Sequence, residues 1–260
     1  MTKTLIGFNG SSGSLGSMMP NSLNTVSFFS RANDTELEIQ KEFEEKKPDI
    51  FIHMAALTDV NICEKNYLLA NAVNSHFPLT VYKAASKNNV KRFIYISTSH
   101  VYKPTSNYQL IKTIDLPNPQ NIYGKTKLTG ERMLLEFSKG DINTELIIVR
   151  LFSLLSQKGR DNFLLQSILR RADSRDFSYM PGLNNVRDFL WAEDACNKII
   201  EIADSVSPPQ IINLCSGSGR TIQSLVEEIF QKRHIDPSEL IKNSQNKDEP
   251  NYLVGEPTCY

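Results

Sequence analysis

Six short apolar runs recur along the chain, and segments with helical periodicity separate most of them. The runs are Thr4–Phe8, Thr25–Phe29, Asp49–Ala56, Lys91–Ser97, Glu145–Leu151 and Ile211–Cys215. An almost continuous apolar run is typical of a strand buried on both faces of a parallel sheet. Helices are expected at residues 17–23, 34–47, 64–89, 121–135, 162–171, 194–203 and 221–232. Strands that alternate with helices predict an α/β fold built on a doubly wound parallel sheet.

A glycine-rich turn follows the first apolar run. Gly10, Gly13 and Gly16 form the pattern G-x-x-G-x-x-G directly after the strand, and the helix at 17–23 is expected next, with Pro20 limiting where it can begin. Glycines let the chain turn sharply and let its backbone approach a pyrophosphate, which binds at the positive N-terminus of a helix. A flexible turn would show the same glycines, but the preceding strand favours dinucleotide binding in a Rossmann-type sheet.

The end of the second apolar run bears on the choice of dinucleotide. An NAD site often has an acidic residue there, which binds the ribose 2′-hydroxyl. This chain has Ser30 and Arg31 instead, a hydroxyl and a guanidinium that suit a 2′-phosphate, although Arg31 is also compatible with a solvated surface residue. We therefore expect NADP(H) in preference to NAD(H). At the end of the third run, Ala55 and Ala56 are small enough for a cofactor to pass close over them.

Two residues of the expected helix at 121–135 are candidates for proton transfer. Tyr123 and Lys127 lie four residues apart, so they share one face of the helix about a turn apart. A lysine ammonium beside a phenol favours the phenolate and is expected to lower the tyrosine pKa from about 10. The tyrosine is then a usable proton donor and acceptor near neutral pH. An ordinary surface helix would show the same pair, so the interpretation depends on its surroundings.

Several polar residues elsewhere in the chain are expected to lie near this pair or to support the site. Thr98, Ser99 and His100 follow the fourth run, and hydroxyls at the carboxyl end of a parallel strand lie where ligands bind in this architecture. Inside the third run, His53 is expected to be a packed, hydrogen-bonded core residue. Asn74 stands in the middle of the expected helix at 64–89, and if it is buried its amide can bond the backbone of the active site.

Composition narrows the classes of function. The 260 residues include 29 Lys plus Arg and 29 Asp plus Glu, a balance that gives no argument for binding nucleic acid or an anionic membrane. The 4 cysteines are far apart, so neither a zinc site nor a disulfide framework is indicated, and no metal is expected. The first apolar stretch is too short for a signal sequence, and Arg150 interrupts the longest one. A soluble cytoplasmic protein is expected.

Six motifs in order along most of the chain resemble the extended branch of the short-chain dehydrogenase/reductase superfamily, whose members act on nucleotide sugars. They are Gly10-x-x-Gly13-x-x-Gly16, His53-Met-Ala-Ala56, Ile96-Ser-Thr-Ser-His-Val-Tyr102, Tyr123-x-x-x-Lys127, Val186-Arg-Asp-Phe189 and Asn213-Leu-Cys-Ser-Gly217. Residues 58–64, 96–102 and 116–131 are most similar to the dTDP-4-dehydrorhamnose reductase group. Residues 186–194 are more similar to the sugar epimerases and dehydratases.

The resemblance implies catalytic roles for three residues. Tyr123 would be the general acid/base, and Lys127 would bind the nicotinamide ribose and tune the tyrosine. Thr98 would bond the sugar oxygen at the reacting carbon, with Ser99 as the fallback for that role. The residues that the resemblance places against the substrate are Thr98, Ser99, His100, Tyr123 and Arg187.

Arg187 would bind the nucleotide or diphosphate of the substrate, for which a bidentate donor is suited. The alternative for this residue is a salt bridge to Asp188 or Asp194. The residues expected to bind the cofactor are Gly10, Gly13, Ser14, Leu15, Gly16, Ser30, Arg31, Ala55, Ala56, Thr58, Asn74, Tyr123 and Lys127.

The resemblance also implies a reaction. The first expectation is an NADPH-dependent reductase of a nucleotide-linked 4-keto-6-deoxy sugar in surface polysaccharide biosynthesis. The second is a nucleotide-sugar 4-epimerase with retained NAD. The third is a non-catalytic dinucleotide-binding regulatory subunit, but such relatives tend to lose the tyrosine or the lysine that this chain keeps. Dehydratases usually have Asp-Glu after the threonine, where this chain has Ser99 and His100, so dehydration is not expected.

Two parts of the chain are expected to divide these tasks. Residues 1–152 would form the NAD(P)-binding Rossmann domain, and residues 153–260 mainly a small substrate-binding lobe, with one strand at about 210–215 returning to the sheet. Members of the branch usually continue beyond a segment like 250–256 with a closing helix, whereas this sequence ends at Tyr260. The lobe is therefore expected to be minimal, or the sequence incomplete. A homodimer is expected from the resemblance alone.

Overall fold

The computed structural model describes residues 4–19, 24–29, 31–158, 163–244 and 250–260. Its strands are β1 (Ile6–Phe8), β2 (Thr25–Ser27), β3 (Ile50–His53), β4 (Arg92–Thr98), β5 (Glu145–Leu151), β6 (Ser153–Leu155), β7 (Val186–Trp191), β8 (Ile211–Leu214), β9 (Gly219–Thr221) and β10 (Tyr252–Leu253). Its α-helices are α1 (Glu36–Lys46), α2 (Val60–Lys65), α3 (Tyr67–Asn71), α4 (Phe77–Lys87), α5 (Ile122–Ser138), α6 (Leu164–Ser174), α7 (Ala192–Asp204), α8 (Ile222–Gln231) and α9 (Ser238–Ser244). Shorter elements are the 3-10 turns η1 (Gly16–Met18) and η3 (Ser99–Val101) and the π-helical segment η2 (Ala72–His76).

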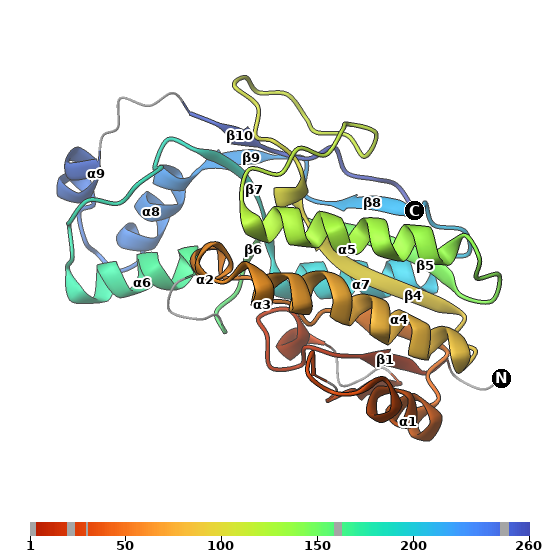
Figure 1. Cartoon of the computed structure of the whole chain (residues 1–260). Coiled ribbons are helices and arrows are strands. Elements are labelled where there is room, and N and C mark those ends of the chain that lie inside the picture. Colours follow the sequence, from red (N-terminus) through yellow and green to blue (C-terminus); the bar gives the residue numbers. More distant parts are fainter. Residues whose placement is uncertain (1–3, 20–23, 30, 159–162, 245–249) are drawn as a thin grey trace.

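Six parallel strands form the central sheet in the order β2-β1-β3-β4-β5-β8 (Figure 1). Ile6 of β1 lies opposite Thr25 of β2 on one side and Ile50 of β3 on the other. The strand order therefore reverses between β1 and β3. Ligands of doubly wound sheets bind beyond the carboxyl ends of the strands at such a switch point. The loops that follow β1 and β3 are consequently the expected cofactor site.

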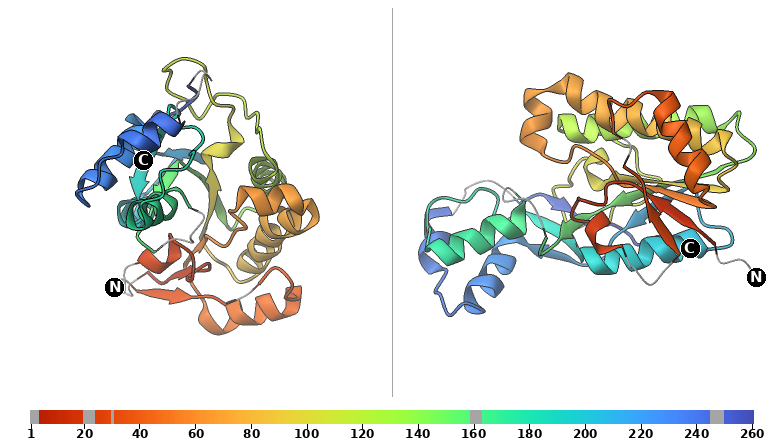
Figure 2. Two further views of the ribbon diagram at one scale, coloured as in Figure 1. Left: turned by 90° about the vertical axis from the view of Figure 1, so that its left-hand side faces the viewer. Right: turned by 90° about the horizontal axis from the view of Figure 1, so that it is seen from below.

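Helices cover both faces of this sheet, as the right-hand view of Figure 2 shows. α1, α4 and α5 cover one face, where Phe43, Phe93 and Leu134 are fully buried. α7 covers the other face, where Ile199 packs in one cluster with Ile94 and other residues of the sheet. Because neither face meets water, the strands are apolar along their whole length instead of alternating.

A smaller lobe lies at the left of Figure 1. Its sheet has the order β10-β7-β6, and β9 pairs antiparallel with β7. α6, α8 and α9 contribute Ile168, Phe230 and Leu240 to its separate core. α7 and β8 lie between lobe segments in sequence but pack in the central sheet layer, so the chain leaves the lobe and returns to it.

Each of the six predicted strands is present, whereas only the first three residues of the helix predicted at 17–23 belong to the described part of the chain. The chain leaves helical geometry at Met19, whose ψ is 128°, so η1 is a single turn. The residue before a proline is disfavoured in the α region, and Pro20 follows. Residues 20–23 themselves lie outside the described part of the chain.

The predicted helix at 64–89 also differs from the structure, which has α2, α3, η2 and α4 in succession from Val60 to Lys87. The π-helical η2 contains Asn74, which is fully buried, and such segments often re-aim side chains at functional sites. β6, β7, β9, β10 and α9 were not predicted. Strands of two or three residues exist only through their partners, which accounts for β6, β9 and β10. Within the described ranges, no helix has both the length and the apolar character needed to cross a bilayer.

Candidate active site

One asparagine at the end of β1 joins the two loops at the switch point. Asn9 is buried, and its Oδ1 accepts hydrogen bonds from the backbone N–H groups of Met54 and Ala55, each at 2.9 Å. Its Nδ2 lies 3.0 Å from Nδ1 of His53. His53 is thus a buried, hydrogen-bonded core residue as predicted, and burial lowers its pKa well below 6.5. The sequence analysis missed Asn9, although a polar residue directly after an apolar strand was an available signal.

The glycine turn is tight enough to demand glycine. Gly10 has a φ of +74°, and a Cβ added to it would lie 2.9 Å from the backbone nitrogen of Ala55. The N–H of Gly13 donates to the Gly10 carbonyl at 2.9 Å, and a Cβ on Gly16 would lie 2.3 Å from that same oxygen. The glycine turn and the loop after β3 thus approach each other closely at the switch point, with no side chain between them at Gly10, and this geometry suits the binding of a dinucleotide pyrophosphate. Only the single turn η1 follows, so the described residues offer no full helix N-terminus.

The other predicted cofactor residues surround this turn. Leu15 packs in the core, so only its backbone is available to a cofactor. Ser14 is half-buried in the glycine turn, as are Ala56 and Thr58 in the loop after β3. Their contact with a dinucleotide stays a prediction.

Arg31 lies beyond the end of β2 and is exposed. Among the described residues, its guanidinium forms no ion pair, which leaves the charge available for a phosphate. Its backbone N–H donates to Oδ2 of Asp34 at 2.6 Å, and the sequence analysis did not consider that carboxylate. The neighbouring Ser30, also predicted to bind the cofactor, lies outside the described residues.

The first turn of α5 brings Tyr123 to the carboxyl end of β4. Thr98, the last residue of that strand, is buried, and its hydroxyl lies near enough to the Tyr123 side chain to influence the pKa of the phenol. Burial raises the pKa of Tyr123 to about 12, and the neighbouring Thr98 hydroxyl opposes that rise. The prediction of a lowered tyrosine pKa is therefore wrong for the protein without cofactor. Burial outweighs the other influences on the phenol, and the amino group of Lys127 donates to a backbone carbonyl.

Lys127 reaches the strand beneath the tyrosine. Its Nζ donates to the carbonyl oxygen of Ile96 at 2.7 Å and lies 3.9 Å from the centre of the Tyr95 ring. Only 1% of the residue is exposed, and burial lowers the pKa of Lys127 to about 7 against the opposing charge of Glu131. An ammonium has three donors, so the carbonyl bond leaves capacity for ribose hydroxyls. The ribose contact itself stays a prediction.

The buried Asn74 of η2 hydrogen-bonds the backbone of the loop that follows β3. Its Oδ1 accepts from the N–H of Leu57 at 2.9 Å, and its Nδ2 donates to the Leu57 carbonyl at 3.0 Å and to Oγ1 of Thr126 at 3.2 Å. As predicted for a buried asparagine, the amide bonds the backbone near the site. The geometry supports an indirect role in cofactor binding, and a direct contact stays a prediction.

His100 stands next to the tyrosine. Its ring lies edge-on to that of Tyr123, with 5.6 Å between the ring centres, and its Nδ1 is 2.9 Å from Nδ2 of Asn121. Burial, followed by the charge of Arg187, lowers the pKa of His100 to about 4. The histidine is therefore neutral at physiological pH. Ser99, the fallback for Thr98, is buried in η3.

Arg187 reaches the site from β7 of the small lobe. Its Nη1 donates to the carbonyl oxygens of Val186 at 2.8 Å and Asn251 at 3.0 Å, and burial lowers the pKa of Arg187 to about 10. Among the described residues it forms no salt bridge to Asp188 or Asp194, the alternative role considered from the sequence. The guanidinium thus remains a half-buried cation without a carboxylate partner in this part of the chain, which suits a phosphate ligand.

A buried ion pair fixes α5 to the sheet below these residues. Nη2 of Arg150 on β5 lies 2.7 Å from Oε2 of Glu131, four residues after Lys127, and both side chains are almost fully buried. The same carboxylate accepts from the Ser97 hydroxyl at 2.5 Å, and Arg150 donates to the Tyr102 hydroxyl at 2.7 Å. The sequence analysis treated Arg150 only as a charge interrupting an apolar stretch, because its partner lies on another element.

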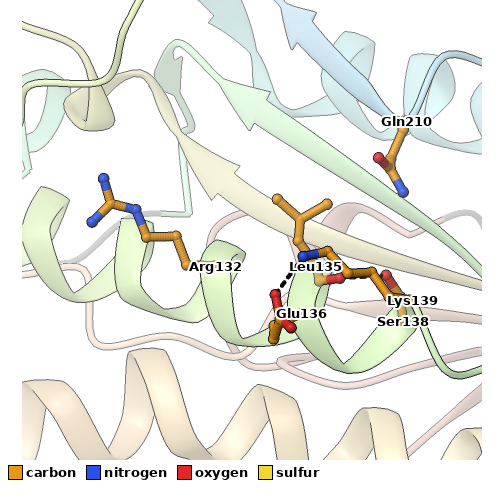
Figure 3. A pocket seen from close by; sticks show the side chains of 6 residues that line it. All are labelled: Arg132, Leu135, Glu136, Ser138, Lys139 and Gln210. Carbon is orange, nitrogen blue, oxygen red and sulfur yellow. Dashed lines mark hydrogen bonds and ion pairs between the residues drawn. The ribbon is translucent and has the colours of Figure 1, made fainter.

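A surface hollow at the far end of α5 is not part of this site (Figure 3). Its lining residues are Arg132, Leu135, Glu136, Ser138, Lys139 and Gln210. α5 rises about 1.5 Å per residue, so the centre of this hollow lies roughly 18 Å along the helix from Tyr123. Its charged residues are exposed, and Glu136 and Lys139 pair with each other.

Comparison with known proteins agrees with this geometry. The sequence pattern of the NAD dependent epimerase/dehydratase family matches residues 16–215. The chain belongs to this family. The predicted extended short-chain dehydrogenase/reductase of the nucleotide-sugar branch is thereby confirmed. A similar relative is the GDP-6-deoxy-D-talose 4-dehydrogenase of Aggregatibacter actinomycetemcomitans, 25% identical over 228 residues, which are 85% of this chain and 74% of the relative. The chain spans 62% of the length of two further relatives.

Solved structures confirm the predicted fold. UDP-glucose 4-epimerase of Thermotoga maritima, solved with UDP-glucose, has a TM-score of 0.83 at 18% identity and covers 98% of this chain and 90% of its own. dTDP-4-dehydrorhamnose reductase of Bacillus anthracis, solved with NADP, has a TM-score of 0.81 at 20% identity over 99% and 90% of the two chains. At these identities the likeness shows the Rossmann-type architecture alone.

Proposed function

We propose that the protein is a reductase that uses NADPH to reduce the keto group of a nucleotide-linked 4-keto-6-deoxy sugar. The observation that carries the proposal is the placement of Tyr123 beside Thr98 at the carboxyl end of β4, with the buried Lys127 one turn further along α5. The family supports it, as do a relative named as a 4-dehydrogenase of a GDP-6-deoxy sugar and a neighbour named as a 4-dehydrorhamnose reductase.

The residues of the chain divide the chemistry around one hydride transfer, which a bound nicotinamide would supply to the keto carbon. Tyr123 donates its phenolic proton to the oxygen that becomes an alkoxide, and its raised pKa keeps that proton in place until the negative charge develops. The Thr98 hydroxyl bonds the same oxygen. The Lys127 ammonium then stabilises the phenolate, and Arg187 binds the diphosphate of the substrate.

NADPH is proposed over NADH because of Arg31. Its exposed guanidinium lies beyond the end of β2, where a ribose 2′-phosphate would be recognised. The neighbour from Bacillus anthracis, which was solved with NADP, supports this choice, whereas other neighbours were solved with NAD. The division into a cofactor domain at 1–152 and a substrate lobe at 153–260, the homodimer, the cytoplasmic location and the role in surface polysaccharide biosynthesis belong to the same proposal.

A 4-epimerase with retained NAD is the second candidate. The structural neighbour named as a UDP-glucose 4-epimerase favours it, as does the resemblance of residues 186–194 to epimerases. Mass spectrometry of small molecules released from the purified protein separates the two. Tightly held NAD supports the epimerase, whereas NADPH consumed in a 1:1 ratio with a keto-sugar is expected for the reductase.

A screen of NADPH oxidation over nucleotide keto-sugars tests the proposal directly. With the best substrate, Tyr123→Phe should lower kcat by about 10²- to 10⁴-fold, the usual contribution of a general acid, while the Kd for NADPH stays nearly unchanged. Tyr67→Phe removes the hydroxyl of an exposed tyrosine on α3 and serves as the matched control. Retention of most activity in Tyr123→Phe would show that the catalytic assignment is wrong.

A further inference from the structure

The N-cap of the catalytic helix determines the hydrogen-bonding state of a neighbouring histidine. Asn121 is the N-cap of α5, and its Oδ1 accepts the N–H of Gly124 at 2.8 Å. The other end of the same amide lies 2.9 Å from Nδ1 of His100. A free helix N–H requires an acceptor, so the oxygen must be the atom at the cap. The nitrogen of the amide therefore faces His100.

This orientation leaves one tautomer for His100. An amide nitrogen is only a donor, so Nδ1 of the histidine must accept and cannot carry a proton. A neutral imidazole then carries its single hydrogen on Nε2. Protonation of Nδ1 would require the amide to turn its oxygen toward His100, which would break the cap on α5.

The Nε2–H group of His100 has no hydrogen-bond acceptor among the described residues, which suggests that it bonds a ligand. His100 is half-buried beside Tyr123, and among the described residues its Nε2 makes no hydrogen bond. The titratable groups around it are Tyr123 from α5 and Arg187 from β7. The nearby carboxylates are committed to other groups, because Glu64 accepts from the N–H of Ile122 and Asp188 accepts from Ser216 and Gly217.

We propose that His100 positions the sugar as a neutral donor, with Nδ1 accepting from Asn121 and Nε2–H donating to an oxygen next to the reacting carbon. Asn121 is then a positioning residue that acts through His100. This inference rests on the proposed function and adds a substrate requirement, namely a carbonyl or hydroxyl oxygen within reach of His100. Sugars without an acceptor at that place are bound more weakly.

Nitrogen-15 NMR of the imidazole rings in the full-length protein tests the tautomer without any substrate. The His100 signals are identified by their loss in His100→Gln. We expect the neutral Nε2–H form between pH 6 and 8, with no titration in that range. Asn121→Asp keeps an N-cap oxygen but presents only acceptors, so it should move the proton to Nδ1 or bring a His100 titration into that range. Asn66→Asp makes the same exchange at the exposed N-cap of α3 and should leave the His100 signals unchanged.

A wild-type Nδ1–H form, or a His100 titration between pH 6 and 8, would overturn the tautomer. Kinetics test the sugar contact with the substrate found in the NADPH screen. His100→Leu should raise KM by roughly 3- to 10-fold, as expected for one neutral hydrogen bond, with a smaller change in kcat. His100→Gln, whose amide N–H can replace Nε2–H, should recover part of that loss. An unchanged KM in His100→Leu refutes the sugar contact alone, whereas a wild type inactive with every keto-sugar refutes the proposed function and the contact together.

Discussion

The buried lysine makes stability depend on pH in an unusual direction. Lys127 is only 1% exposed, and burial lowers its pKa from 10.5 to about 7. Its Nζ has one carbonyl partner, the Ile96 oxygen at 2.7 Å, and no carboxylate within bonding distance among the described residues. Between pH 7 and pH 10.5, the unfolded chain therefore binds a proton that the folded chain releases. Stability in that range should rise with pH.

The size of this effect follows from the two pKa values. A full proton of difference changes the free energy of unfolding by about 1.4 kcal/mol for each pH unit. At pH 7, Lys127 is still protonated in about half of the folded molecules. The difference in bound protons between the unfolded and folded states is therefore smaller near pH 7, and the free energy of unfolding rises less steeply there. Between pH 7 and pH 9 the lysine should add about 2 kcal/mol to the free energy of unfolding.

Urea unfolding of the dinucleotide-free protein at both pH values measures this contribution. Other titrating groups contribute equally to the rise in the wild type and in a variant, so they cancel when the two rises are compared. Lys127→Met should lose about 2 kcal/mol of the pH-dependent rise seen in the wild type. Lys125→Met, at an exposed position of the same helix, should retain the rise. An equal rise in Lys127→Met and in the wild type would mean that Lys127 is protonated in the folded protein at pH 9.

Three further substitutions test the site and its supports. Glu131→Gln leaves a buried guanidinium unpaired and should lower the free energy of unfolding by about 3 kcal/mol or more in urea, whereas Glu136→Gln breaks an exposed pair and should cost at most about 0.5 kcal/mol. Equal effects would contradict the buried pair. Gly16→Ala places a Cβ 2.3 Å from a loop carbonyl and should raise the dinucleotide Kd more than tenfold by titration calorimetry, while Gly140→Ala, with its nearest atom at 3.8 Å, should not. Arg31→Ala should reduce the NADPH-to-NADH ratio of kcat/KM by about tenfold, and an unchanged ratio would remove the argument for NADP.

The central sheet could be predicted because each strand carries its own signal. β5 has the bounds predicted for the run Glu145–Leu151, since polar residues stop an apolar run that is buried on both faces. The dinucleotide turn was equally readable, because its glycines are required by local backbone geometry. Of the helix predicted after that turn, the described residues contain only the single turn η1, and the chain leaves helical geometry at Met19, the residue before Pro20.

The sequence predicted less of the small lobe and of the residues that hold the site in place. β9 and β10 contain 3 and 2 residues and exist only because they pair with β7. Asn9 and Glu131 matter through partners that lie 44 or more and 19 residues away in the chain. No periodicity links such residues, so a single sequence without homologues contains no signal for their contacts.

By itself, the sequence determined the Rossmann-type sheet, the glycine turn and the Tyr123–Lys127 pair, because apolar runs, glycine geometry and helical spacing are local properties. The tertiary structure decided the chemical state of that pair. Burial raises the pKa of Tyr123 to about 12 and lowers that of Lys127 to about 7, opposite to the expectation for the tyrosine. It also decided that Asn121 faces His100 and that Arg187 enters the site from the lobe. Proton affinity depends on desolvation and on distances between elements, and neither is written in the spacing of residues along the chain.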